Sequence, residues 1–266
     1  MNYLDELENK SIYIVREAAS RFCSCGLLWS MGKDSTTLLW IARKAFFGKI
    51  PFPVIHIDTS FKFKEIYSFR DTYAKKWGLN LLVSQNKGAL EKGMNPHASK
   101  FDCCHALKTE ALKETIKTHG FEALLLAIRR DEHGIRAKER YFSPRDFNFN
   151  WDYSDQPPEL WDFYKSQANI KEHLRIHPML HWTELDVWRY IQREKIPVID
   201  LYLAKNKKRY RSIGCATCCA PVESNADSIK KIVRELEQTK TSERSGRAQD
   251  KEDVYTMQRL RSLGYM

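Results

Sequence analysis

The sequence predicts an α/β protein with a doubly wound, mostly parallel sheet and helices on both faces. Short apolar runs alternate with amphipathic stretches through the first two thirds of the chain, as strands alternate with helices in such folds. The apolar runs contain few polar residues, which is typical of strands covered on both faces. Strands are expected over residues 27–29, 53–57, 79–83 and 123–128, and helices over 34–47, 63–77 and 103–119.

The pattern changes beyond the last of these strands. Residues 143–178 are rich in Pro, Asp, Asn and aromatic residues without a clean period, and we expect a long, ordered loop there. A helix is expected to begin after Thr183, because Thr183 and Asp186 have the spacing of a capping box. Another helix is expected over 225–238, and the polar tail that follows should wrap over the domain or fold with a partner. The expected units are a nucleotide-binding α/β domain, 1–222, and a C-terminal helix and tail, 223–266.

The composition is that of an ordinary globular protein with an excess of positive charge. The 266 residues include 44 Lys and Arg against 34 Asp and Glu, a formal net charge of +10. No apolar run approaches the ~20 residues that span a bilayer, and no secretory signal pattern is recognisable, so we expect a cytoplasmic protein with no membrane partner. Seven cysteines in that setting are expected to be thiols or metal ligands rather than disulfides. The positive charge fits a solvated surface, a site for a polyanion such as ATP, or a nucleic-acid track.

The segment Ser30–Ser35, which reads Ser-Met-Gly-Lys-Asp-Ser, lies between an expected strand and an expected helix. A turn with glycine at this place lets backbone N–H groups approach an anion, and the helix N-terminus adds partial positive charge. Ser30 and Ser35 supply hydroxyl donors, and Lys33 supplies a positive charge. The spacing differs from that of a Walker A loop, Gly-x4-Gly-Lys-Ser/Thr. We interpret the segment as an anion-binding loop rather than a strand–turn–helix with a chance Gly-Lys pair.

This segment resembles the PP-loop of the ATP pyrophosphatases, whose pattern is Ser-Gly-Gly-x-Asp-Ser; Met31 replaces the first glycine. The superfamily has an adenine nucleotide alpha hydrolase-like fold and includes the phosphoadenylyl-sulfate reductases and sulfate adenylyltransferase subunit 2. The resemblance extends over nearly the whole chain. Its segment nearest the C-terminus, residues 242–247, is most similar to sulfate adenylyltransferase subunit 2. The segments that carry it beyond the loop are 56–59, 129–140, 182–188 and 242–247.

The resemblance implies an enzyme that splits ATP between its α and β phosphates with the help of Mg²⁺. The C-terminal ends of parallel strands are where such sheets bind ligands, and guanidinium groups suit phosphate or sulfate. Asp58 has an alternative interpretation as a turn cap, and Asp131 as a charge partner of neighbouring arginines. The implied nucleotide-binding residues are Ser30, Gly32, Lys33, Asp34, Ser35, Asp58 and Arg136. The implied catalytic residues are Lys33, Arg129, Arg130 and Asp131.

Two pairs of cysteines form a second pattern. Cys103 and Cys104 open an expected helix, and Cys215 and Cys218 form a Cys-x-x-Cys turn. Such a turn presents two thiolates to one metal, and a second pair can complete four ligands. The arrangement resembles the 4Fe–4S site of adenylyl-sulfate reductases and implies such a cluster on these four residues; zinc or buried free thiols are the alternatives. Those reductases also use a cysteine near the C-terminus, and none follows Cys219, so reduction of a sulfonucleotide is not expected.

Two functions fit these patterns. The first is adenylylation of sulfate, an uphill reaction that the resembling family couples to a GTPase large subunit. The second is ATP-dependent sulfur transfer to a nucleic-acid phosphate, as in DNA phosphorothioation with a cysteine desulfurase partner, which accounts for the cysteines and the charge. A non-catalytic nucleotide-binding role is disfavoured by the intact Lys33, Asp34 and Ser35. The sequence leaves the acceptor, the metal and a homo-oligomeric state open.

Overall fold

The computed structural model describes residues 2–151, 156, 158–164, 173–241, 243 and 256–265. Within these residues, the main sheet has six strands in the order β3-β2-β1-β4-β6-β5. Neighbouring strands are parallel except β5 and β6, which are antiparallel. The predicted, mostly parallel α/β sheet is therefore confirmed. Its strands are β1 Cys25–Leu28, β2 Val54–Ile57, β3 Leu81–Ser84, β4 Ala123–Leu125, β5 Phe142–Arg145 and β6 His173–Ile176.

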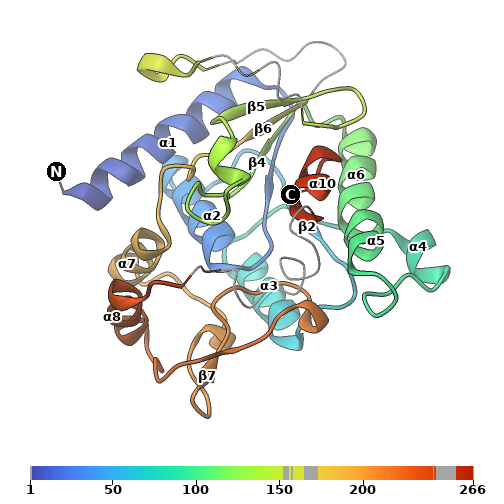
Figure 1. Ribbon diagram of the computed structural model, residues 1–266. Helices are drawn as coiled ribbons and strands as arrows, with labels where there is room; N and C mark the ends of the chain where they lie inside the picture. The colour runs from blue at the N-terminus through green and yellow to red at the C-terminus, as the bar shows by residue number, and fades with distance from the viewer. Residues whose placement is uncertain are drawn as a thin grey trace.

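Helices cover both faces of this sheet (Figure 1). The first face is covered by α1 Tyr3–Arg21, α2 Lys33–Ala45, α3 Lys64–Lys76 and α7 Glu184–Glu194, and α8 Ile229–Gln238 packs on α7. The second face is covered by α6 Ala111–His119, which continues from α5 Lys100–Cys104 through a π-helix, His105–Glu110. The short helix α4 Lys87–Glu91 precedes these, and α10 Thr256–Ser262 packs on α5. The ribbon β7 Lys208–Arg209 and β8 Val222–Glu223 lies apart from the main sheet.

The strands divide the core into two layers because successive side chains point to opposite faces. Leu27 and Leu125 belong to the cluster that contains the buried residues of α1, α2 and α7. Leu28 and Leu124 belong to the cluster that contains the buried residues of α6. Both faces are thus apolar, which explains why the sequence of these strands shows short continuous apolar runs.

The prediction of a loop over 143–178 is wrong at both ends of that segment. β5 and β6 pair there, and β6 also pairs with β4 in the middle of the sheet. These strands lack a continuous apolar run because they contain polar residues. Arg145, His173 and Arg175 are strand residues, and all three are buried. Residues 152–155, 157 and 165–172 of the expected loop lie outside the described residues.

The helix α1 also went unpredicted. It begins at a capping box, in which the Asn2 side chain accepts from the Asp5 N–H and the Asp5 carboxylate accepts from the Asn2 N–H. Leu7, Ile14 and Val15 form its buried stripe.

In the described part of the chain, no helix is both long and apolar enough to cross a membrane.

The predicted capping box at the start of α7 is present. The Thr183 hydroxyl accepts from the Asp186 N–H at 3.2 Å, and the Asp186 carboxylate accepts from the Thr183 N–H at 2.9 Å.

Replacing Thr183 with Ala should therefore lower the free energy of unfolding by about 1 kcal/mol. Urea denaturation measures this. Ser228→Ala is the matched control, because the Ser228 side chain makes no capping bond to the backbone of α8 and its loss should change stability by less than about 0.5 kcal/mol. Equal losses would contradict the role of the capping box.

Candidate functional site

The anion-binding loop lies between β1 and α2, as predicted. The Ser35 hydroxyl accepts from the Ser30 N–H at 3.2 Å and lies 3.0 Å from the Ser30 hydroxyl, and Gly32 is the N-cap of α2. Met31 adopts a left-handed conformation with φ of 61° and its side chain is buried. The turn therefore keeps a left-handed residue where the PP-loop pattern has glycine, and such strained residues concentrate at ligand sites.

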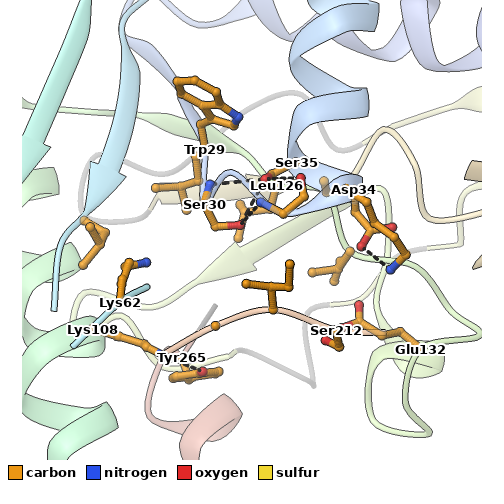
Figure 2. Close-up of a pocket in the computed structure, with 18 of the residues that line it drawn as sticks. Trp29, Ser30, Asp34, Ser35, Lys62, Lys108, Leu126, Glu132, Ser212 and Tyr265 are labelled. Carbon is orange, nitrogen blue, oxygen red and sulfur yellow. Dashed lines mark hydrogen bonds and ion pairs between the residues drawn. The ribbon is translucent and has the colours of Figure 1, made fainter. Parts of the chain in front are cut away.

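A cavity of about 180 Å³ opens in front of this loop (Figure 2). Its floor consists of residues at the ends of β1, β2 and β4, which is the edge where parallel sheets bind ligands. The predicted loop residues line it, together with Arg136; Asp58, Arg129, Arg130 and Asp131 are not among its lining residues. The apolar lining residues include Leu28, Ile55, Ile57, Leu126 and Ile128, and the polar ones include Lys62, Lys108, Glu132, Arg136, Ser212 and Tyr265.

A network of buried charges holds the loop in place. Lys33 Nζ lies 3.0 Å from Asp34 Oδ2 and 2.5 Å from Glu243 Oε1. The Arg129 guanidinium contacts Asp34 and Glu243 and donates through Nε to Asp131 at 2.9 Å. Arg129 and Lys33 are 0% and 1% exposed. Three carboxylates thus surround two buried cations, which is the arrangement that buried charges require.

These contacts shift the pKa values of the network. Burial alone would lower the pKa of Lys33, but Asp34 and Glu243 outweigh it and raise that pKa above its ordinary value. The pKa of Arg129 is raised for the same reason. Burial alone would raise the pKa of Glu243, and Lys33 and Arg129 instead lower it to about 2. Burial raises the pKa of Asp131. Lys33, Arg129 and Glu243 are therefore charged at neutral pH.

The remaining predicted residues, Asp58, Arg130 and Arg136, have other partners. The Asp58 carboxylate accepts from the Ser60 N–H and from the Tyr67 hydroxyl, both at 2.9 Å, which matches its interpretation as a turn cap. The guanidinium of Arg130 lies 5.2 Å from the centre of the Tyr141 ring. Arg136 pairs with Glu132, and both side chains line the cavity.

Among the residues of the site that went unpredicted, three come from distant parts of the chain. Glu243 lies in a segment that carried the family resemblance, and that was its one signal. The Tyr202 hydroxyl accepts from the Lys33 N–H at 2.8 Å and lines the cavity. Tyr265 lines the cavity as well. Neither tyrosine lies in a recognisable motif, so no local pattern could have identified it.

The four cysteines of the predicted cluster are all buried and approach one another. Burial, together with the neighbouring thiols of Cys104, Cys215 and Cys218, raises the pKa of Cys103 to about 12. Lys62, which lines the cavity, forms a backbone bridge with Cys215. The thiols therefore lie beside the cavity, as the pairing of the two motifs predicts.

The arrangement of these thiols does not fit a metal centre. A 4Fe–4S cluster needs four thiolates around one position. Among the described residues, no three His, Cys, Asp or Glu side chains are grouped so that they could hold a metal ion. The predicted cluster has no support from this geometry.

Comparison with known proteins identifies relatives over the full chain. Residues 24–221 match the phosphoadenosine phosphosulfate reductase domain family. Sulfate adenylyltransferase subunit 2 of Colwellia psychrerythraea is 40% identical over 297 aligned positions, which cover 100% of this chain and 99% of that protein. The enzyme of the same name from Pseudomonas fluorescens is 40% identical and covers 100% and 98%.

Solved structures share the fold. The phosphoadenylyl-sulfate reductase of Candida auris, in a phosphate complex, has a TM-score of 0.56 at 17% identity and covers 84% of this chain and 98% of that chain. The FMN adenylyltransferase of Candida glabrata, in complex with ATP, has a TM-score of 0.57 at 16% identity and covers 82% and 63%. At these identities the likeness concerns the fold, which agrees with the predicted class.

The low pKa of Glu243 makes part of the stability depend on pH. Its pKa is about 2 in the folded chain against an ordinary value of 4.5, which corresponds to roughly 3 kcal/mol. Because the folded pKa is depressed, this contribution is complete above the ordinary value and is lost as the pH falls towards 2. The stability difference between the wild type and Glu243→Gln should therefore shrink between about pH 5 and pH 3.

Urea denaturation of both proteins across that range measures the effect. Glu237→Gln is the control, because Glu237 forms an exposed pair with Arg189, and such pairs contribute at most about 1 kcal/mol. A constant difference between the wild type and Glu243→Gln at all pH values would contradict the ionic role of Glu243.

Proposed function

The chain belongs to the phosphoadenosine phosphosulfate reductase domain family, and from this premise we propose that it transfers the adenylyl group of ATP to sulfate. The observation that carries this proposal is the full-length similarity, at 40% identity, to enzymes named sulfate adenylyltransferase subunit 2. A sulfate oxygen attacks the α-phosphorus of ATP, the bond between the α-phosphorus and its bridging oxygen breaks, and pyrophosphate leaves. The products are adenylyl sulfate and pyrophosphate.

The loop at Ser30–Ser35 is suited to hold the leaving pyrophosphate. Its backbone N–H groups lie at the N-terminus of α2, where an anion is stabilised by the helix dipole. The Ser30 and Ser35 hydroxyls add donors, and Lys33 adds a positive charge at the same place. Donors fixed before the reaction stabilise the charge that develops on the leaving group.

The two carboxylates that line the cavity, Asp34 and Glu132, offer the oxygen ligands that Mg²⁺ prefers. When bound, the ion would offset the negative charge of the phosphates and the charge that develops on the leaving group. Arg136 lines the cavity and is assigned to the phosphates. Arg129 is assigned a positioning role, because its guanidinium binds Asp34, Asp131 and Glu243 and does not line the cavity.

A second subunit is part of this proposal. The relatives are named subunit 2, which supports a partner protein for this chain as well. Formation of adenylyl sulfate is uphill, and a GTPase large subunit, which the family resemblance implies, would supply the energy. The alternative function, sulfur transfer to nucleic acid with a cysteine desulfurase, finds no support in the comparisons or in the geometry of the thiols.

The reverse reaction offers a direct test, because it runs downhill. With adenylyl sulfate and pyrophosphate, the wild type should form ATP and sulfate, and luciferase reports the ATP. Ser35→Ala removes a hydroxyl from the loop and should lower the rate about a hundredfold, the effect of losing one fixed donor to a developing charge. Lys33→Ala should abolish it, since Lys33 is the cation of the loop.

Ser20→Ala and Lys49→Ala are matched controls, because both residues are exposed and lie outside the cavity. They should retain the wild-type rate. Formation of ATP by Ser35→Ala at the wild-type rate would remove the loop from the mechanism. Absence of ATP formation by the wild type, alone and with the partner subunit, would refute sulfate adenylylation.

A further inference from the structure

Residues 256–265 return to the cavity from the far end of the described chain. The helix α10 packs on α5, and Leu260 and Tyr265 form an apolar cluster with Cys104. The Tyr265 side chain is buried and lines the cavity. In Figure 2, Tyr265 lies across the cavity from Ser30 and Ser35, next to Lys108. The ring therefore forms the wall opposite the loop that is suited to pyrophosphate.

A buried arginine fixes the backbone of this wall. Arg175, on β6, donates through Nη1 to the Tyr265 carbonyl at 2.8 Å and through Nη2 to the Gly264 carbonyl at 2.5 Å. It is 0% exposed, and no carboxylate of the described residues pairs with it. A buried cation is costly unless polar groups surround it. The two carbonyls are the groups that Arg175 binds, so the strand and the turn stabilise each other.

The turn also depends on glycine at position 264. Gly264 has φ of +94°, in the region that side chains rarely adopt. A Cβ at this position would lie 2.6 Å from the Phe149 carbonyl oxygen, which belongs to the backbone and cannot move aside cheaply. The turn is thus held from two sides, by Arg175 and by close contact with residue 149.

Lys108 fixes the orientation of the ring. Its Nζ donates to the Tyr265 hydroxyl at 3.2 Å and lies 5.5 Å from the ring centre. Lys108 belongs to the π-helix between α5 and α6, and π-helical turns concentrate at functional sites. Backbone, ring and hydroxyl of Tyr265 therefore each have a partner, and the ring is presented to the cavity in one orientation.

We infer that Tyr265 is a binding residue for the adenosine half of the nucleotide and that Arg175 is its positioning residue. The inference rests on the nucleotide substrate of the proposed function. The pyrophosphate end of the cavity is at Ser30–Ser35, so the part of ATP that extends across the cavity floor is its adenosine. That floor is apolar, formed by Ile55, Ile57 and Leu126, and an aromatic ring above an apolar floor suits a purine. Tyr265 lies outside residues 24–221, which match the family domain.

The two halves of the nucleotide can be tested separately with AMP and inorganic pyrophosphate, by titration calorimetry. Tyr265→Ala should weaken AMP binding about tenfold, the scale of losing one aromatic contact with a base. Pyrophosphate binding should be unchanged, because the loop is intact. Tyr265→Phe keeps the ring and should retain AMP binding within about twofold. Unchanged AMP affinity in Tyr265→Ala, or equal loss of both ligands, would overturn the inference.

The positioning role needs variants that leave the ring in place. Arg175→Ala should weaken AMP binding without affecting pyrophosphate, and Gly264→Ala should do the same if the arginine variant does not fold. Gly120→Ala is the matched control: Gly120 also has positive φ, +63°, but a Cβ there meets no atom within 4 Å. It should lose stability and keep both affinities. AMP affinities in Gly264→Ala equal to those in Gly120→Ala would refute the positioning role.

The same titrations separate this inference from the proposed function. If the wild type makes no ATP from adenylyl sulfate and Tyr265→Ala still loses AMP binding selectively, sulfate adenylylation is refuted. Tyr265 then remains an adenosine-binding residue. Formation of ATP by a wild type whose Tyr265→Ala variant binds AMP normally would refute the role of Tyr265 and leave the proposed function intact.

Discussion

The site depends on the requirement that two buried cations have carboxylate partners. Lys33 begins α2, and Arg129 follows β4; each would be strongly destabilising without an opposite charge. Glu243 contacts both cations and is separated from Arg129 by 114 residues in the sequence. Asp131 extends the network to α7 by accepting from the Glu184 N–H at 2.7 Å. One set of charges therefore connects the loop, the sheet, a helix and the polar tail.

The central strands could be predicted because their chemistry is local. β1 and β4 place apolar side chains on both faces of the sheet, and so does β2 apart from the buried His56. A short, nearly continuous apolar run therefore identifies each of them. β5 and β6 could not be predicted in this way. They contain Arg145, His173 and Arg175, whose burial depends on partners elsewhere in the fold: Arg145 pairs with Glu139, and Arg175 binds distant carbonyls. A polar residue in a sequence does not reveal that its partner is buried with it.

The residues of the site also differ in whether a local sequence pattern could identify them. The loop Ser30–Ser35 could be predicted because a strand, a glycine turn and a helix N-terminus are contiguous in the sequence. Tyr202 and Tyr265 could not, because they reach the cavity through contacts that no local pattern encodes. The two cysteine motifs could be predicted only in part. The cysteine pairs do approach each other as predicted, but proximity of four thiols does not by itself make the geometry of a cluster.

Two buried arginines each hold a residue from the last part of the chain in place at the site, and they do so through different partners. Arg129 binds carboxylates and keeps Glu243 beside the loop, whereas Arg175 binds carbonyls and keeps Tyr265 on the opposite wall. Because both contacts join segments about 90 or more residues apart, the cavity forms only when the later part of the chain has packed on the sheet. A ligand that binds the cavity favours that packed state by its binding free energy. Filling the site and packing Glu243 and Tyr265 around it are therefore thermodynamically linked.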